Sequence, residues 1–323
     1  GYCTDVWFNQ ALSFMDAHRG DEEPFFCLIT TNAPHSPFIV DRRYSDPYLG
    51  QVETERRAEF YGMITCIDEN LGALRAQLDD WGLTENTIFI FMTDNGTAGG
   101  ATLDGDRFVV GGYNAGMRGV KGSEYEGGHR VPLLIQWPAG GIDHGRDVPE
   151  LTANVDLMPT LLDLCGVDPG AHTFHGRSLA PLLRDSEADW PDRVLVTDSQ
   201  RITSPVKWRK SATMSARWRL VNGVELYDMD VDPGQKQDVA ALHPAVVAKL
   251  RAGYESWWTK VSEQFDGTIP IPVGQELGVT ALLNAHDWRN DPVECAWNQC
   301  LVREGMACNG YWEVDVRVSG RYR

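Results

Sequence analysis

The stretch Asn86-Thr-Ile-Phe-Ile-Phe-Met-Thr-Asp-Asn-Gly96 decides the fold class of this sequence. Its apolar run, Ile88 to Met92, is too short for a helix and is rich in β-branched and aromatic residues, so it predicts a strand buried on both faces. Such strands belong to mostly parallel sheets that helices cover, which makes the predicted fold class α/β. Asp94 and Asn95 then follow the carboxyl end of a core strand, where open α/β sheets place their ligands.

The side chains at this strand end offer a carboxylate and an amide oxygen. Both are hard ligands, so Asp94 and Asn95 suit Ca²⁺ or Mg²⁺ better than a softer ion. Gly96 lets the chain turn sharply after them. A simpler interpretation also fits, namely an Asn-Gly turn that closes a strand, and this stretch alone does not separate the two.

The composition indicates a globular, acidic protein. The chain has 323 residues, 42% of them hydrophobic, which is enough for one large domain and a smaller one. Lys and Arg number 29 against 46 Asp and Glu, and the net charge of -17 would repel nucleic acid, which we do not expect as a partner. An anionic substrate therefore requires positive charge concentrated near Asp94. No apolar run is long enough for a membrane span, and nothing indicates an oligomeric state.

Seven cysteines leave the redox compartment open. Four are scattered through apolar segments and are predicted to be ordinary buried thiols. These four are Cys3, Cys27, Cys66 and Cys165. The other three cluster near the end of the chain without the paired spacing of a zinc site, and a disulfide among them is left undecided. These three are Cys295, Cys300 and Cys308.

A second ligand-bearing loop is predicted earlier in the chain. Residues 25–31 have the composition of another buried strand and lead into Asn32-Ala-Pro-His-Ser-Pro37, whose prolines stiffen the loop around His35. From Thr54 to Trp81 apolar residues recur at helical spacing. Strand, helix and strand then make a right-handed parallel unit, which would set His35 and Asp94 on the same edge of the sheet. A lone histidine also fits a purely structural role.

The required positive charge lies in Gly116-Met-Arg-Gly-Val-Lys-Gly-Ser-Glu-Tyr-Glu-Gly-Gly-His-Arg-Val-Pro132. Because this glycine-rich segment falls between two predicted core strands, we expect its basic residues to lie near Asp94. These residues are Arg118, Lys121, His129 and Arg130. The alternative is a mobile surface loop in which Glu124 and Glu126 neutralise the cations.

The pattern changes after about residue 189. Four short alternating segments follow, and Asn222-Gly223 between the last two predicts a two-residue hairpin. Pro244 then begins an amphipathic helix. We therefore predict three parts: residues 1–189 form the main α/β part, 190–265 a small antiparallel sheet with one helix, and 266–323 an incomplete β extension.

Four motifs occur in a fixed order along the first 265 residues. They are Pro34-His-Ser-Pro37, Thr93-Asp-Asn-Gly96, Lys121-Gly-Ser-Glu-Tyr-Glu-Gly-Gly-His-Arg-Val-Pro132, and Glu225-Leu-Tyr-Asp228 with Asp232-Pro233. In this order they make the chain resemble the arylsulfatase-type sulfatases of the alkaline phosphatase superfamily. The resemblance implies an alkaline-phosphatase-like sheet, with residues 1–189 as the C-terminal part of the catalytic domain and residues 266–323 as the start of an extra β module.

The resemblance also implies a role for each candidate residue. Asp94 and Asn95 match the later pair of ligands to one calcium ion, and His35 and Lys121 match two catalytic side chains that hold the sulfate group. Two cations and a calcium ion would neutralise charge on the transferring group and on the leaving oxygen. The other cations of the loop remain for substrate binding. They are Arg118, His129 and Arg130.

The nucleophile of the family is a formylglycine made from a Cys or Ser in a Cys/Ser-x-Pro/Ala-x-Arg motif, and this sequence contains no such motif. The early acidic pair of the calcium site and the Lys-x-His segment are also missing. In the family all three lie upstream of the residues matched here. We therefore expect this chain to belong to a longer protein, to be inactive alone, and to be poorly stable because apolar strand edges would be exposed. The resemblance implies a periplasmic or secreted location.

These expectations combine into a calcium-dependent sulfuric ester hydrolase. Its predicted substrate is a sulfated carbohydrate or an aryl sulfate, and the remaining cations favour a sulfated polysaccharide. Two alternatives stay open. One is a phosphodiester or phosphonate hydrolase of the same superfamily. The Asp94-Asn95 pair argues against it, because an Asp-His pair would be expected there. The other is a non-catalytic protein that binds anions or sugars.

Overall fold

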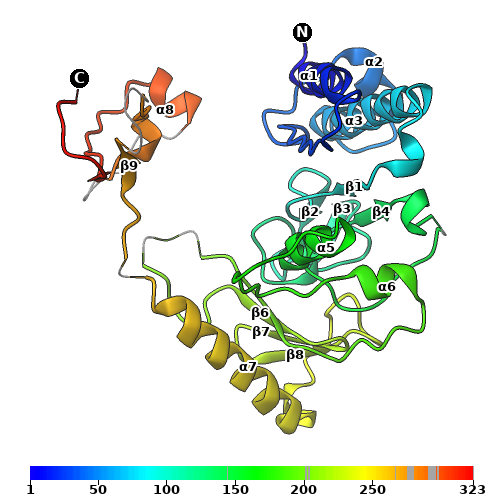
Figure 1. Cartoon of the computed structure of the whole chain (residues 1–323). Helices are drawn as coiled ribbons and strands as arrows, with labels where there is room; N and C mark the ends of the chain where they lie inside the picture. Colours follow the sequence, from blue (N-terminus) through cyan, green and yellow to red (C-terminus); the bar gives the residue numbers. More distant parts are fainter. Residues whose placement is uncertain are drawn as a thin grey trace. The chain divides into compact units, whose positions relative to one another are not determined.

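The computed structural model describes residues 1–143, 145–200, 202, 204–265, 267–274, 280–289, 296 and 298–322. The chain divides into two compact units, Gly1–Trp258 and Thr259–Arg323 (Figure 1). The boundary near residue 189 falls inside the first unit and stays a prediction. In the described part of the chain, no helix has both the length and the apolarity needed to cross a membrane.

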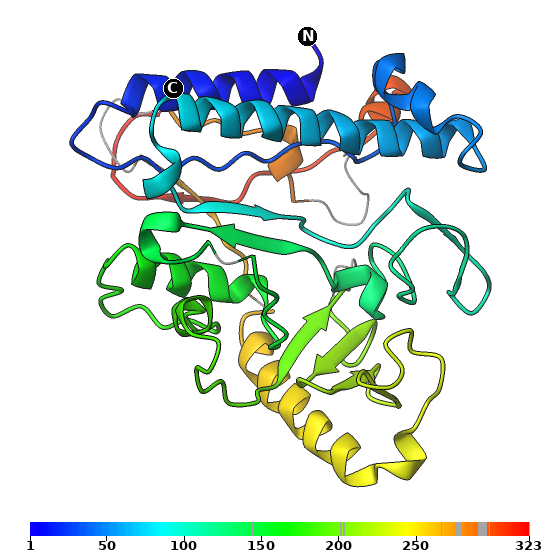
Figure 2. The same cartoon turned by 90° about the vertical axis from the view of Figure 1, so that its right-hand side faces the viewer.

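The first unit begins with a layer of helices. Helix α1 (Cys3–His18) packs against α3 (Glu55–Asp80), and Figure 2 shows the two side by side. Helix α2 (Arg42–Ser45) and the 3-10 turn η1 (Asp46–Tyr48) pack against α3 as well. The Thr54 hydroxyl caps α3 by accepting a hydrogen bond from the Arg57 backbone at 3.2 Å. The long helix predicted from the apolar spacing is therefore confirmed.

Residues 25–31 do not form the predicted strand. The segment is extended, and alternate side chains pack on the α1–α3 core, but it pairs with no strand among the described residues. Phe26 and Leu28, on its other side, are 72% and 73% exposed. Alternation without a hydrogen-bonded neighbour does not make a strand. The expected strand-helix-strand unit is therefore not formed in this structure.

The strand predicted over Ile88 to Met92 is present as β1 (Phe89–Met92), but its residues are half-buried and not buried on both faces. Its neighbour is β4 (Leu133–Gln136), and the pair is antiparallel, with Met92 opposite Leu133. Strands β2 (Ala101–Leu103) and β3 (Val109–Gly112) form a second antiparallel pair. The mostly parallel sheet is not confirmed: every pair of described strands in the first unit is antiparallel, because residues 25–31 supply no parallel neighbour for β1.

Short helices and turns connect these strands to the next sheet. Helix α5 (Leu157–Leu164) is held at its start by Asp156, a buried carboxylate that pairs with Arg193. Helix α6 (Ala180–Arg184) packs against α5. The 3-10 turns are η2 (Thr84–Asn86), η3 (Pro138–Gly140), η4 (Asn154–Asp156) and η5 (Ala240–Leu242).

A four-stranded antiparallel sheet follows, as the sequence predicts. Its strands lie in the order β5 (Leu195–Asp198), β6 (Ser211–Met214), β7 (Trp218–Val221) and β8 (Glu225–Asp228). The hairpin between β7 and β8 turns at Asn222 and Gly223, whose φ angles of 50° and 72° are both left-handed. Two successive left-handed residues match the twist of the flanking strands, so Asn-Gly correctly predicts a hairpin here.

The two faces of this sheet have different neighbours. Leu220 of β7 and Leu226 of β8 pack against Leu250 of helix α7 (Pro244–Ser262). Because side chains alternate along a strand, Arg219 and Val221 point to the other face. There Val221 packs with Tyr125 and Tyr227. The sheet therefore lies between α7 and the segment that contains Tyr125.

The second unit contains strands β9 (Ile271–Val273) and β10 (Val314–Val316), which pair in parallel. It also contains η6 (Ala285–Asp287) and α8 (Gln299–Arg303). The Trp288 and Trp312 rings meet edge to face, with centroids 5.8 Å apart.

The predicted burial of four cysteines is only partly correct, and the disulfide state of the other three stays partly undecided. Cys66 is buried and Cys27 is half-buried, but Cys3 and Cys165 are exposed, because they lie at helix ends and not on a core face. Cys300 and Cys308 are free thiols. Cys295 lies outside the described residues.

Candidate active site

Two loops that are far apart in the sequence are joined by their backbones. The Asp94 loop comprises residues 93–97, and the Lys121 loop comprises residues 116–132. The Lys121 N–H donates to the Thr97 carbonyl at 2.9 Å, and the Gly96 N–H donates to the Gly128 carbonyl at 3.1 Å. These bonds hold the predicted oxygen ligands and the predicted cations in neighbouring segments.

This close approach explains the glycines. A Cβ atom on Gly96 would lie 1.8 Å from the Gly127 carbonyl oxygen, and one on Gly127 would lie 2.1 Å from the Gly119 carbonyl oxygen. No side chain fits at such distances, so these positions require glycine. Residues 123–128 are all buried. The loop is therefore packed, and the alternative of a mobile surface loop does not describe it.

Three of the predicted site groups are available to a ligand. Within the part of the chain that the structure describes, the Asp94 carboxylate, the Asn95 amide and the Lys121 ammonium form no hydrogen bond or ion pair. Polar groups that are neither deeply buried nor bonded internally can exchange water for a ligand at little cost. Their pairing with one another is not seen, and their roles stay predictions.

His35 lies on an exposed loop that is anchored at both ends. Its Nδ1 lies 2.8 Å from the Ser36 carbonyl, which can only accept, so Nδ1 carries the proton and Nε2 is the remaining ring nitrogen. The Trp7 indole donates to Asn32 at 3.0 Å. At the other end Phe38 packs against Gly99: a Cβ atom added to Gly99 would lie 2.6 Å from the Phe38 ring. Through Phe38 the His35 loop reaches the segment that follows Asp94.

Asp94 and Asn95 supply the right kind of ligand atom for a calcium ion, but too few of them. They offer about three side-chain oxygens between them, whereas calcium takes about six to eight. Among the described residues there is no group of three or more His, Cys, Asp or Glu side chains that could hold a metal. The pair therefore forms part of a coordination shell, and other ligands must complete it.

Arg118 joins the Lys121 loop to the four-stranded sheet. Its guanidinium donates to the Tyr227 hydroxyl at 2.9 Å and to the Asp106 carbonyl at 2.9 Å. It also lies over the Tyr125 ring, 3.9 Å from the centroid. These contacts give Arg118 a structural part, and a direct bond from it to substrate stays a prediction.

Glu126 is the centre of a buried cluster of charges. The Arg219 Nε donates to its carboxylate at 2.6 Å, His129 Nε2 lies 3.3 Å away, and an Arg130 nitrogen lies 3.5 Å away. Its backbone N–H donates to the Gln235 side chain at 2.8 Å. Burial raises the pKa of Glu126, but the hydrogen bond from His129 and the charge of Arg219 outweigh it and lower this pKa to about 2.

The two acidic residues of the loop therefore act differently. Glu124 pairs with residues outside the loop: its carboxylate accepts hydrogen bonds from Arg107 at 2.6 Å and from Asn222 at 3.2 Å. Glu126 does pair with His129 and Arg130, as the neutralised-patch alternative expected. Lys121 has no carboxylate partner among the described residues, so its charge is not compensated. Substrate binding by His129 and Arg130 stays a prediction.

Sequence reasoning missed the residues that support the loop from β7 and β8. Arg219 is 8% exposed and bonds Glu126, and Tyr227 bonds Arg118. A signal was present, because an arginine inside an apolar strand, Trp218-Arg-Leu-Val221, requires a buried partner. The partner itself could not be read, since nothing in the sequence relates β7 to residue 126.

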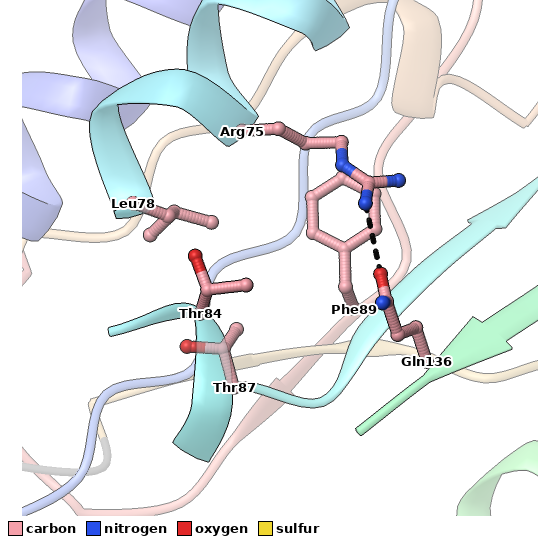
Figure 3. Close-up of a pocket in the computed structure, with 6 residues that line it drawn as sticks. All are labelled: Arg75, Leu78, Thr84, Thr87, Phe89 and Gln136. Atoms are coloured by element: carbon pink, nitrogen blue, oxygen red, sulfur yellow. Dashed lines mark hydrogen bonds between the residues drawn. The ribbon is translucent and has the colours of Figure 1, made fainter. Parts of the chain in front are cut away.

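A cavity between α3 and the start of β1 is not the substrate site. It is lined by Arg75, Leu78, Thr84, Thr87, Phe89 and Gln136 (Figure 3). The Arg75 guanidinium donates to the Gln136 amide oxygen across it at 3.0 Å. Its volume of about 20 Å³ has room for about one water molecule. Asp94 follows the other end of β1.

The low pKa of Glu126 predicts how stability depends on pH. A carboxyl group with a lowered pKa stabilises the fold above its ordinary pKa of 4.5, and this is lost as the pH falls towards the folded value of about 2. Between about pH 6 and about pH 3 we expect the free energy of unfolding to fall by about 2 kcal/mol more in wild type than in Glu126→Gln. Urea unfolding at both pH values measures this difference. An equal fall in the free energy of unfolding in both proteins would show that Glu126 is not ionised beside Arg219.

Family models match the chain over both parts of this site. A model described as Sulfatase matches residues 1–167, which are more than half of the 323 residues. A second, described as N-sulphoglucosamine sulphohydrolase, C-terminal, matches residues 121–252. The two overlap on the Lys121 loop.

Individual relatives agree with these models. N-acetylglucosamine-6-sulfatase of Homo sapiens is 26% identical over 321 residues, covering 77% of this chain and 54% of that protein. Steryl-sulfatase of Mus musculus is 35% identical over 212 residues, covering 65% of this chain and 32% of that protein. The chain thus spans about half the length of the first relative and a third of the second.

A solved structure agrees with the fold. Ps i-CgsB in complex with k-i-k-neocarrahexaose is 25% identical, with a TM-score of 0.66, and the match covers 79% of this chain and 55% of that one. This likeness supports the alkaline-phosphatase-like α/β class, although the described strands do not form a mostly parallel sheet. With its first 167 residues matched by the family model, the chain belongs to the sulfatases of the alkaline phosphatase superfamily.

Proposed function

We propose that this chain forms part of the active site of a calcium-dependent sulfuric ester hydrolase. The observation that carries the proposal is the pair of backbone hydrogen bonds between the Asp94 loop and the Lys121 loop. They join a segment whose oxygen ligands have no partner among the described residues to a segment whose ammonium has no carboxylate partner among them. A sulfate ester needs both, because the ester is anionic and charge develops on its leaving oxygen.

In this proposal each residue has a defined part. Asp94 and Asn95 would hold the calcium ion together with ligands from outside this cluster, and a bound ion would supply Lewis-acid stabilisation of negative charge on the sulfate. Lys121 stabilises negative charge on the sulfate. His35 contacts the sulfate through Nε2, which donates only when both ring nitrogens are protonated, because Nδ1–H is already bonded to the Ser36 carbonyl. The proposed nucleophile is a formylglycine, as the resemblance implies, and no residue of this chain is assigned to it.

The proposed substrate is a sulfated carbohydrate, and the proposed location is periplasmic or secreted. The name of the human relative, N-acetylglucosamine-6-sulfatase, supports a sugar sulfate. Arg130 supports it independently: one of its nitrogens lies 3.5 Å from Glu126, but its side chain is 62% exposed, so it can also contact a second anionic group on the substrate.

The test is kinetic and needs the full-length protein. We expect Arg130→Ala to lower kcat/KM about tenfold for anionic sulfated sugars, because a charge-assisted hydrogen bond is lost, and less than about twofold for a small aryl sulfate. Arg42→Ala is the matched control, since Arg42 is exposed and its ion pair with Glu55 spans 3.9 Å. Equal losses for both substrates would overturn the carbohydrate preference. Failure of the full-length protein to hydrolyse any sulfate ester would overturn the proposed function.

A further inference from the structure

The Lys121 loop is attached along one face of the β7–β8 hairpin. Both strands of the hairpin contribute polar side chains on this face, and the opposite face packs on α7. The contacts that hold the loop on this face, which we call its anchors, are the Arg219–Glu126 ion pair, the Asn222–Glu124 hydrogen bond and the Tyr227–Arg118 hydrogen bond. The position of the loop is therefore set by a sheet that is remote in the sequence.

The Arg219–Glu126 pair is the most deeply buried of these anchors. Both side chains are nearly inaccessible, at 8% and 1% exposure. Arg219 also donates to the Ser215 carbonyl at 2.6 Å, so its guanidinium is fixed on the sheet. A carboxylate buried this deeply is strongly destabilised without its main cation, because the His129 and Arg130 contacts that remain are longer, at 3.3 and 3.5 Å. Removal of Arg219 should therefore move Glu126, and α4 (Glu126–His129) with it.

Such a movement would reach the predicted sulfate-binding groups. His129 Nε2 contacts the same carboxylate oxygen as Arg219, and its Nδ1 is buried with no hydrogen-bond partner among the described residues. The two residues that follow Glu126 leave little slack, since the Gly127 N–H donates to the Arg118 carbonyl at 2.8 Å and the Gly128 carbonyl accepts from the Gly96 N–H. A shift of Glu126 thus disturbs the bonds that join the Lys121 loop to the Asp94 loop.

We propose that Arg219 is a positioning residue for sulfate binding, acting through Glu126 on the Lys121 loop and on the ring of His129. This inference rests on the proposed function. It extends that function to the four-stranded sheet, which becomes a support of the binding site and not only a neighbouring subdomain.

The experiment compares two arginines of the same region. Arg219→Met removes the buried pair, and Arg217→Met is the matched control, because Arg217 is half exposed and pairs with Asp228 at the end of the hairpin. Inorganic sulfate is titrated into the full-length protein in calcium-containing buffer. We expect the Kd for sulfate to rise at least about tenfold in Arg219→Met and less than about twofold in Arg217→Met.

Limited trypsin digestion gives a readout that does not depend on the function. Lys121 and Arg130 lie in the packed loop, so wild type and Arg217→Met should resist cleavage after them, whereas Arg219→Met should be cut there. Mass spectrometry identifies the cleavage sites.

A double variant separates positioning from stability. Glu126→Gln/Arg219→Met leaves no buried charge unpaired, so its melting temperature should recover towards wild type. Its Kd for sulfate should stay raised, because the anchor is still missing. Recovery of both properties, or an unchanged Kd in Arg219→Met, would overturn the inference. Absence of sulfate binding by wild type would instead overturn the proposed function, and the inference with it.

Discussion

Replacement of Lys121 by alanine is expected to lower kcat/KM of the full-length protein for sulfate esters by about 10²–10³-fold. The Lys121 ammonium has no carboxylate partner among the described residues, so its charge is free to act on a bound anion. The backbone N–H of the same residue is bonded to Thr97, which the substitution leaves intact. The loss should therefore come from the side chain and not from a displaced loop.

Steady-state kinetics with an aryl sulfate measures this loss. Lys249→Ala provides the control, since Lys249 lies on the surface and its ion pair with Asp192 spans 3.4 Å. Lys121→Ala should keep the melting temperature of wild type. Activity within about threefold of wild type would remove Lys121 from the sulfate-binding groups.

Replacement of Gly96 by alanine is expected to destabilise the fold by about 3 kcal/mol. The added Cβ atom would lie 1.8 Å from the Gly127 carbonyl oxygen and 2.8 Å from the Gly127 carbonyl carbon. Backbone atoms on both sides must separate to accept it, and the hydrogen bond from Gly96 to Gly128 would break. Since this contact joins the two loops, sulfate binding should be lost as well.

Gly72→Ala is the matched control for this second prediction. Gly72 lies in α3, and a Cβ atom there would meet nothing within 4 Å. Alanine has the higher helix propensity, so this variant should gain about 0.5–1 kcal/mol. Urea unfolding of the two variants gives the comparison. A Gly96→Ala protein as stable as wild type would mean that the two loops do not touch as described.

Local signals in the sequence predicted the elements but not all of their pairings. The apolar spacing from Thr54 gave α3, and Asn222-Gly223 gave the β7–β8 hairpin, because helix periodicity and left-handed turn residues act over a few positions. Residues 25–31 have the apolar composition of a buried strand, yet they pair with no described strand. A strand depends on a distant partner, and no local pattern supplies that information.

The candidate site shows the same division. Asp94 and Asn95 were identified because they follow a core strand, and the basic residues near Lys121 because their segment falls between two predicted core strands. Arg118 was predicted to meet substrate, but its hydrogen bonds to Tyr227 and Asp106 fasten the loop. A basic residue next to a binding motif can serve either the ligand or the fold. The position of its partners, of which Tyr227 lies on β8, shows the structural part of Arg118, and its contact with substrate stays a prediction.

The central claim is that the Asp94 loop and the Lys121 loop together bind calcium and sulfate. A crystal structure of the full-length protein grown with calcium and inorganic sulfate tests it most directly. We predict a calcium ion about 2.3–2.6 Å from oxygens of both Asp94 and Asn95, with a sulfate within hydrogen-bonding distance of Lys121 Nζ and His35 Nε2. A calcium ion bound elsewhere, or a sulfate out of reach of Lys121, would contradict the account.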